Sequence, residues 1–302
     1  MSIRKLAVLL VLGGMAAIPA LAHGPHSLES MAMPGATKTT SSSRATVSPA
    51  QLKPGKPQAM LIFVRDGRGR PVERFALQHE KLMHLIVVSD DLTFFDHLHP
   101  QYVGGGRFRV TANLPASGSY TAFADYLPQG GSPQVSALHL QAGSGSTASV
   151  PLTPDSPLSK RAGDLTVTLK LDSGSIAPGR QTPLTFFIKD GNGNPVTDLQ
   201  PYLGAMGHLV VIRQSPVLTA ADYLHAHPED QGGHSMGAMA EMHHTHGERQ
   251  QMAGMDQMAA SQKAEPGSVS FKTVFPGPGT YRLWAQFQRN GKIITADYTI
   301  AV

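Results

Sequence analysis

The stretch FVRDGRGRPV, at residues 63–72, returns 124 positions later as FIKDGNGNPV, at residues 187–196. Each version joins an apolar run of β-forming residues to a turn in which Asp, Gly and Pro cluster. The same offset places MHLIVV, which contains His84, on GHLVVI, which contains His208. The repeat predicts that the chain is an internal duplication and that its two copies share one fold.

Two further matches extend the repeat toward the end of each copy. HLHP at 97–100 matches HAHP at 225–228 with an offset of 128, and LPASGSYTAFADY at 114–126 matches FPGPGTYRLWAQF at 275–287 with an offset of 161. The second copy therefore carries an insertion of 33 residues between these motifs. Surface loops accept such insertions at modest entropic cost, so we expect a loop here.

Each copy reads as a series of short strands. Runs rich in β-branched and aromatic residues alternate with turn residues, and helical periodicity is weak. The fold class that we predict is all-β, with two tandem antiparallel β-sandwiches of immunoglobulin or cupredoxin type. The expected strands are 59–65, 82–88, 108–113 and 119–126 in the first copy, and 165–171, 182–189, 208–213, 269–274, 280–287 and 293–302 in the second.

The first residues have the pattern of a secretory signal. Arg4 and Lys5 precede an apolar run, and Ala-Leu-Ala at 20–22 forms a cleavage site of A-x-A type. We predict a cut after Ala22 and a periplasmic or secreted protein. The predicted organisation is a signal peptide at 1–22, a disordered arm at 23–50, a first sandwich at 51–140, a linker at 141–163, and a second sandwich at 164–302 that holds a His/Met-rich insertion at 229–266.

Composition excludes several classes of function. The formal charge is +4, and removal of Arg4 and Lys5 with the leader lowers it to about +2. So small a charge does not suggest a nucleic-acid partner. The chain has no Cys, which excludes disulfides, thiolate metal sites and cysteine catalysis. No transmembrane segment is expected in the mature chain.

Histidines recur at matching positions of the two copies. Residues i and i+2 of a strand face the same side, so each H-x-H motif should present two imidazoles together. A hairpin with the preceding strand would add a third. The predicted metal triads are His84, His97 and His99, and His208, His225 and His227, with the thioethers of Met83 and Met206 nearby. Three imidazoles with an open position suit copper, or zinc as an alternative. The competing interpretation is that these histidines are structural, with ring nitrogens that bond the fold itself.

Other polar residues near the motifs have simpler expectations. Asp96 and Asp222 precede or lie near the H-x-H motifs, and we expect them to orient imidazoles by hydrogen bonding. His79 and His139 have no counterpart in the second copy, and we expect them at the surface.

The insertion is rich in His and Met. Residues 232–258 contain no Leu, Ile, Val, Phe, Tyr or Trp, so we predict a mobile loop rather than part of a core. Thioethers favour Cu(I) and imidazoles suit Cu(II), so a loop that offers both can bind copper in either oxidation state. Its candidate ligands are His234, Met236, Met239, Met242, His243, His244, His246, Met252, Met255 and Met258. Cleavage after Ala22 would add His23 as a terminal chelate.

At HLIVVSDDLTFFDHLHP, PYLGAMGHLVVI and PGPGTYRLWAQFQRNGK, the chain resembles bacterial exported proteins with tandem YtkA-like, copper-associated β-sandwich domains. The resemblance spans most of 55–140 and 165–302, and it implies an envelope protein linked to copper handling. We therefore expect a non-enzymatic protein that buffers, delivers or gives resistance to copper, with a membrane metal transporter or another envelope copper protein as partner. The alternatives are an envelope adaptor whose histidines are structural, and a copper-dependent redox enzyme.

Overall fold

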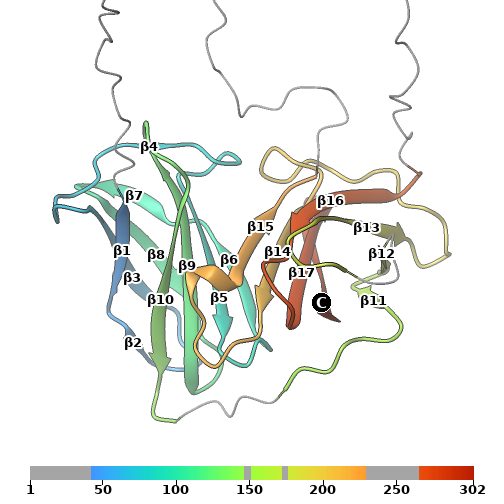
Figure 1. The fold of residues 1–302 in the computed structure, drawn as a ribbon, viewed down its shortest axis with the longest axis horizontal. Helices are drawn as coiled ribbons and strands as arrows, with labels where there is room; N and C mark the ends of the chain where they lie inside the picture. The colour runs from blue at the N-terminus through green and yellow to red at the C-terminus, as the bar shows by residue number, and fades with distance from the viewer. Residues whose placement is uncertain (1–41, 146–150, 172–175, 229–264) are drawn as a thin grey trace, which may run out of the picture. The chain divides into compact units, whose positions relative to one another are not determined.

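The computed structural model describes residues 42–145, 151–171, 176–228 and 265–302 (Figure 1). Among these residues every regular element is a β-strand except η1 (Ala220–Asp222), a single 3-10 turn. Apart from one short parallel pair, the strands pair antiparallel, and their sheets form two sandwiches, which confirms the predicted fold class. Both sandwiches belong to one compact unit, Thr40–Val302.

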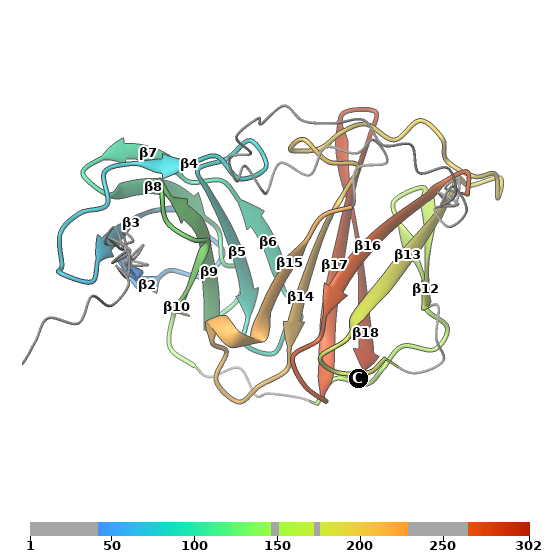
Figure 2. The same ribbon diagram turned by 45° about the horizontal axis from the view of Figure 1, so that its top comes forward.

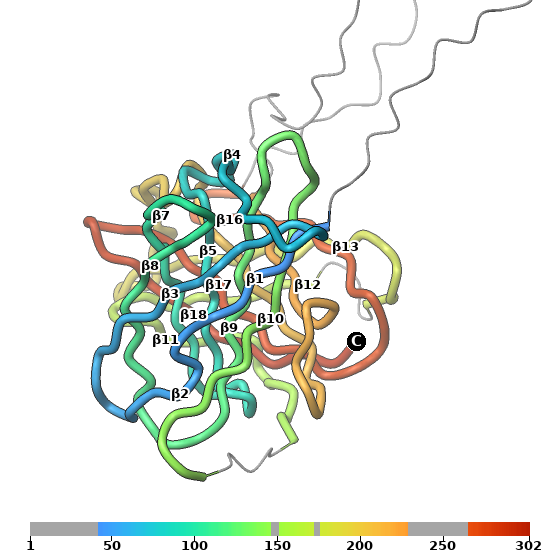
Figure 3. Tube along the Cα trace, turned by 90° about the vertical axis from the view of Figure 1, so that its left-hand side faces the viewer, coloured from blue at the N-terminus to red at the C-terminus, as the bar shows by residue number. Residues whose placement is uncertain are grey.

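The first sandwich, which is turned toward the viewer in Figure 3, has two sheets. Its outer sheet has the order β1 (Ser43–Ser48), β3 (Gln58–Asp66), β8 (Arg107–Ala112) and β7 (Gln101–Gly104). Its inner sheet has the order β2 (Gln51–Leu52), β10 (Gln134–Ala142), β9 (Gly118–Pro128), β5 (Met83–Ser89) and β6 (Phe95–Leu98), and β4 (Phe75–Ala76) pairs with β9.

The second sandwich repeats this plan. Its outer sheet has the order β11 (Ser159–Ala162), β12 (Leu165–Leu171), β13 (Gln181–Lys189) and β16 (Ser268–Val274). Its inner sheet has the order β15 (Tyr223–Ala226), β14 (His208–Arg213), β17 (Thr280–Arg289) and β18 (Lys292–Ala301). The strand order β10-β9-β5-β6 therefore corresponds to β18-β17-β14-β15, as the sequence repeat requires.

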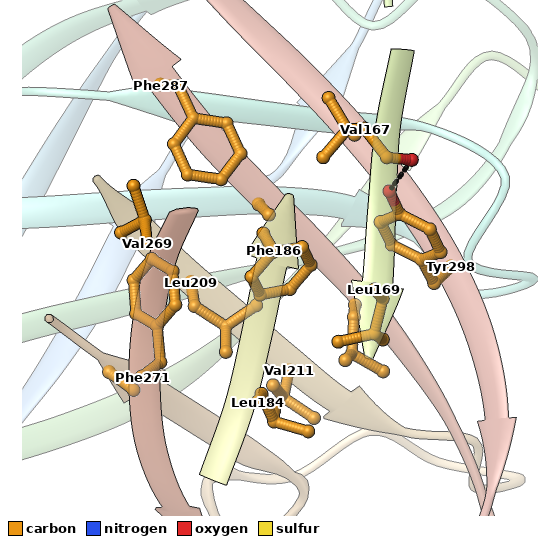
Figure 4. Close-up of a cluster of buried hydrophobic side chains, with 14 of the residues drawn as sticks. Val167, Leu169, Leu184, Phe186, Leu209, Val211, Val269, Phe271, Phe287 and Tyr298 are labelled. Carbon is orange, nitrogen blue, oxygen red and sulfur yellow. Dashed lines mark hydrogen bonds between the residues drawn. The ribbon is translucent and has the colours of Figure 1, made fainter. Parts of the chain in front are cut away.

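Each sandwich closes around its own apolar core. Strand alternation decides which side chains enter it: along β8, every second residue is buried. In the second core, Phe186 packs edge-on against Phe271 with ring centres 5.5 Å apart (Figure 4). The Tyr298 hydroxyl donates to the Val167 carbonyl at 2.7 Å, which satisfies a polar atom that the core would otherwise bury alone.

Strands β5 and β14 of the inner sheets are buried on both faces. Every residue of β5 is buried, and β14 is buried over five of its six positions. A third apolar cluster explains this, because it joins residues of both sandwiches: Ile86, Val88, Leu92 and Phe123 from the first, and Val210, Ile212, Leu218, Tyr223 and Trp284 from the second. The inner sheets thus pack face to face, and β5, β6, β14 and β15 lie side by side in Figures 1 and 2.

The repeated turns form for the same reason in both copies. The Asp66 carboxylate accepts two backbone N–H bonds at 2.9 Å from the turn that follows it, and Asp190 does the same. Gly106 and Gly267 occupy equivalent places with φ of 67° and 72°. A Cβ at Gly106 would lie 2.6 Å from the Val64 carbonyl oxygen, so only glycine fits this close approach.

Two predicted boundaries need correction. Residues 43–48 of the predicted disordered arm form β1, because SRATVS alternates polar and apolar residues and turns Ala45 and Val47 toward the core. Residues 159–162 of the predicted linker form β11, which pairs with β12.

The predicted insertion lies outside the described residues except for residues 265–266. The described part of the chain also contains no helix with the length and apolar character that a membrane crossing needs.

Candidate metal centre at the interface of the sandwiches

Two β-hairpins bring the predicted histidines together. Strand β5 pairs with β6 so that Ile86 lies opposite His97, and β14 pairs with β15 so that Val210 lies opposite His225. His84 is the second residue of β5 and lies on the same face as Ile86, and the H-x-H motif spans the end of β6. The hairpin that the sequence analysis required for each triad is therefore present.

The described residues contain two groups of three histidines able to hold a metal ion. They are His84, His97 and His99, and His208, His225 and His227. Within each group, one ligand atom from each residue lies within 4.8 Å of the others. In both groups the first histidine is buried and the other two are half-buried.

In the first triad, the hydrogen bonds fix the tautomers of two rings. Nε2 of His84 lies 3.0 Å from the Gln78 carbonyl oxygen, which can only accept, so Nε2 carries the proton. Nδ1 of His97 lies 2.7 Å from Oε1 of Gln286 and is likewise the donor. The remaining nitrogens, Nδ1 of His84 and Nε2 of His97, face each other at 3.0 Å. Neutral rings thus present two lone pairs to one point, and Nε2 of His99 is buried with no hydrogen-bond partner among the described residues.

The second triad repeats this arrangement. Nε2 of His208 donates to the Tyr202 carbonyl at 2.9 Å, and Nδ1 of His225 donates to Oδ2 of Asp125 at 3.2 Å. Nδ1 of His208 and Nε2 of His225 then face each other as acceptors at 3.4 Å. Nε2 of His227 is buried and also lacks a hydrogen-bond partner within the described part of the chain.

The turns that accept from His84 and His208 are strained in both copies. Residues 78–81 form a two-residue hairpin loop with φ of 46° at His79 and 65° at Glu80, conformations that L-residues rarely adopt. The matching loop in the second copy has φ of 52° at Leu203 and 74° at Gly204. The Nε2–H groups of His84 and His208 donate to the carbonyl of the first residue of each loop. These two histidines therefore bond the loops to the inner sheets.

The group that orients one histidine of each triad comes from the other sandwich. Gln286 lies on β17 and contacts His97 on β6, whereas Asp125 lies on β9 and contacts His225 on β15. The two contacts are equivalent, because Asp125 pairs with His84 in the first sheet and Gln286 pairs with His208 in the second. The hydrogen bonding of neither triad is therefore complete within one sandwich.

Comparison with known proteins adds the family. The profile of one family, described as a domain of unknown function (DUF8832), matches residues 38–142 and 160–302. The chain belongs to the DUF8832 family. None of the functionally curated proteins matches the DUF8832 chain.

Solved structures with some likeness to the DUF8832 chain include two bacterial adhesins. One is FdeC, an Escherichia coli adhesin, with 15% identity, 87% of this chain and 65% of that chain covered, and a TM-score of 0.23. The other is the Yersinia pseudotuberculosis adhesin InvE, with 12% identity, 88% and 60% covered, and a TM-score of 0.23. The DUF8832 chain spans less than two thirds of either adhesin, and likeness at this level carries no inference about function.

Burial keeps the histidines of the DUF8832 triads neutral. Desolvation lowers the pKa of His84 to about 4, and that of His99 and His208 to about 3. It also lowers the pKa of His97, His225 and His227, and neighbouring imidazoles lower those of His225 and His227 further. Neutral imidazole is the form that binds metal ions, so the rings are ready to act as ligands at neutral pH.

The structure places the other predicted residues differently. Met83 is 1% exposed and points into the first core, because neighbouring residues of a strand face opposite sides and His84 takes the interface side. The prediction of Met83 as a ligand is therefore wrong. Met206 is exposed and stays a prediction. The remaining predicted ligands lie outside the described residues: His23, His234, Met236, Met239, Met242, His243, His244, His246, Met252, Met255 and Met258.

The predicted orienting carboxylates also need correction. Asp222 bonds Arg213 at 2.9 Å and the backbone N–H of Thr219, so its carboxylate closes a loop and does not orient an imidazole. Asp96 adjoins His97 on β6 and so lies on the other face of that strand. The groups that do orient the imidazoles, Asp125 and Gln286, are buried polar residues of β9 and β17, and they stand at matching positions of the repeat.

His79 is a seventh histidine at this centre. It is exposed, as expected, but its ring stacks on that of His227 with centres 3.2 Å apart and planes 18° apart. Its ring centre also lies 5.8 Å from that of His208. The hairpin loop of the first sandwich thus extends the second triad, a contact between copies that neither copy predicts alone.

Proposed function

We propose that this DUF8832 chain is an exported copper-binding protein that buffers, delivers or gives resistance to copper and does not catalyse a reaction. Each triad would hold one ion through three neutral imidazoles. The observation that carries the proposal is the pair of opposed acceptors in each triad, at 3.0 and 3.4 Å. Two lone pairs at this distance repel unless a cation lies between them.

The geometry of these pairs fits a metal ion. Two nitrogens bound to one tetrahedral ion at about 2.0–2.1 Å lie about 3.3 Å from each other. The third nitrogen of each triad supplies another ligand, and one coordination position stays open for exchange. Imidazole suits both copper and zinc, and the resemblance to copper-associated YtkA-like domains favours copper.

The His/Met-rich segment supports a role in transfer. Residues 232–258 begin five positions after His227, so the segment follows the second triad closely in the sequence. Soft thioethers there would take Cu(I), and exchange of one ligand at a time would pass ions to the triads or to a partner. A membrane metal transporter or another envelope copper protein would be that partner.

Copper content of the purified protein tests the proposal. We expect the wild type to hold more copper after dialysis than the variant His97→Ala/His99→Ala/His225→Ala/His227→Ala, because the loss of two ligands dismantles each triad. The matched control is His139→Ala, which removes an exposed histidine of β10 and should leave the copper content unchanged. Equal copper in the wild type and the fourfold variant would refute the triads as sites, and preferential loading with zinc in a competition would refute copper.

The structural interpretation of the histidines has one observation in its favour. His84 and His208 each hold a loop carbonyl through Nε2, which is a role that needs no metal. Thermal unfolding with and without metal separates the two interpretations, since a ligand that binds only the folded state raises Tm by mass action. We expect copper to raise Tm. No shift with Cu(I), Cu(II) or Zn(II) would favour an envelope adaptor.

A further inference from the structure

The rings of the two triads contact each other across the interface. The ring centre of His84 lies 5.2 Å from that of His225 and 6.1 Å from that of His208. The ring centre of His97 lies 6.0 Å from that of His208 and 5.9 Å from that of His225. Within a triad the corresponding separations reach 5.2 Å for His84 and His97, and 5.6 Å for His208 and His225. Rings of opposite triads are therefore about as close as rings of the same triad.

A pseudo-twofold relation between the sandwiches explains the contact. Phe95 stacks on Trp284 with centres 4.8 Å apart and planes 16° apart, and the equivalent Tyr223 stacks on Phe123 at 5.0 Å and 17°. The hydrogen bonds from Gln286 and Asp125 follow the same reciprocity. An interface in which each half presents the same patch brings equivalent residues together near its axis. The triads lie at such a position.

Two bound ions would share one compartment. An ion held at about 2.0–2.1 Å from an imidazole nitrogen lies about 3 Å from the centre of that ring. Because the rings of the two triads are in contact, histidine rings alone separate the two ions. Six neutral imidazoles bring no charge to offset the repulsion between two dications in this buried place. The first ion bound should therefore weaken the binding of the second, which couples the two triads.

We infer that the two triads form a single dinuclear copper centre, in which two Cu(II) ions lie on either side of the contacting histidine rings and interact with each other. This inference rests on the proposed function, because it requires that the triads bind copper. The inference goes beyond the proposed function because it places the two ions in one coupled centre between the sandwiches.

Electron paramagnetic resonance of the full chain titrated with Cu(II) tests the inference. An isolated Cu(II) ion gives an ordinary single-ion spectrum, whereas two neighbouring ions give a dipolar-broadened, half-field or silent spectrum. We expect the single-ion signal to grow while one triad fills and to broaden when an ion enters the other triad. The signal of copper bound by residues 232–258 is measured in a variant that lacks both triads, and it is subtracted from the signal of the wild type.

Variants that lose one triad supply the matched comparison. His97→Ala/His99→Ala and His225→Ala/His227→Ala should each bind one triad ion with a single-ion spectrum, and the sum of their spectra should not reproduce the wild type. The milder His97→Gln and His225→Gln repeat the comparison where an alanine variant does not fold. In the wild type, the spectra at half and full loading give the same test without any substitution.

Three other outcomes separate the inference from the proposed function. Two triad ions with additive single-ion spectra would overturn the dinuclear centre and leave copper binding intact. One ion that is lost on removal of either triad would also overturn it, in favour of one shared site. Equal copper in the wild type and in the variant without triads would overturn the proposed function itself.

Discussion

Nδ1 of His97 donates a hydrogen bond of 2.7 Å to Oε1 of Gln286, although 189 positions separate the two residues in the sequence. The bond joins the two sandwiches and fixes the tautomer of a candidate metal ligand. The equivalent bond runs from His225 of the second sandwich to Asp125 of the first, and 100 positions separate these two residues. Metal affinity in either triad therefore depends on how well the sandwiches dock.

Gln286→Ala should weaken copper binding at the first triad by about 10- to 100-fold, because the loss of a partner that orients a ligand imidazole typically costs this much. Competition with a chromophoric chelator measures the affinity. Gln134→Ala is the control, since that side chain bonds only its own turn. An unchanged affinity in Gln286→Ala would show that His97 needs no orienting partner.

Asp125→Asn should weaken the second triad, because a carboxylate that accepts from His225 makes its other nitrogen a stronger donor to metal than an amide does. The reciprocal change Gln286→Glu should strengthen the first triad and reduce the difference in affinity between the two. Stepwise copper titration gives both affinities. The idea fails if the two triads respond alike to Asp125→Asn.

The apo protein should lose stability as the pH falls below about 6.5. The folded pKa values of His84 and His208, about 4 and about 3, lie below the unfolded value, so the unfolded chain binds more protons in this window. For His84, the linkage removes about 2 kcal/mol of folding free energy between pH 7.5 and pH 5. Urea unfolding at pH 7.5, 6 and 5 measures the loss. His84→Gln should make the free energy of unfolding depend less on pH. A wild type that is equally stable at all three pH values would contradict the prediction.

Phe95→Ala should lower the free energy of unfolding by about 2–4 kcal/mol, because it removes a ring that stacks on Trp284 at the interface. It should also reduce copper binding at both triads, since the orienting bonds depend on docking. Phe94→Ala is the matched control: Phe94 packs edge-on against Tyr120 within the first sandwich. Loss of stability with full copper affinity in Phe95→Ala would separate docking from metal binding.

Copper should quench the fluorescence of Trp284, the only Trp of the chain. It lies two residues before Gln286 on β17 and is 3% exposed. Ions at the triads would lie within quenching range. The His97→Ala/His99→Ala/His225→Ala/His227→Ala variant should show much weaker quenching at equal copper. Equal quenching in both proteins would place the bound copper elsewhere.

Much of the fold follows from local pattern. The strands expected at 165–171 and 208–213 match β12 and β14, because β-branched runs between turn residues have few other choices. β1 and β10 escaped prediction, since their polar and small residues form strands only beside a partner strand. The triads were predictable as well, because the two-residue period places an H-x-H pair on one side of a strand.

By itself the sequence determined that there are two copies, that each is a β-sandwich, and that each carries three histidines on one hairpin. Only the tertiary structure decided that the two triads meet, that Gln286 and Asp125 orient His97 and His225, and that His79 joins the cluster. The physical reason is that strand periodicity is a local property, whereas docking depends on the shape of two whole sheets. The continuous apolar runs of β5 and β14 indicated that both faces are buried, but not what covers them.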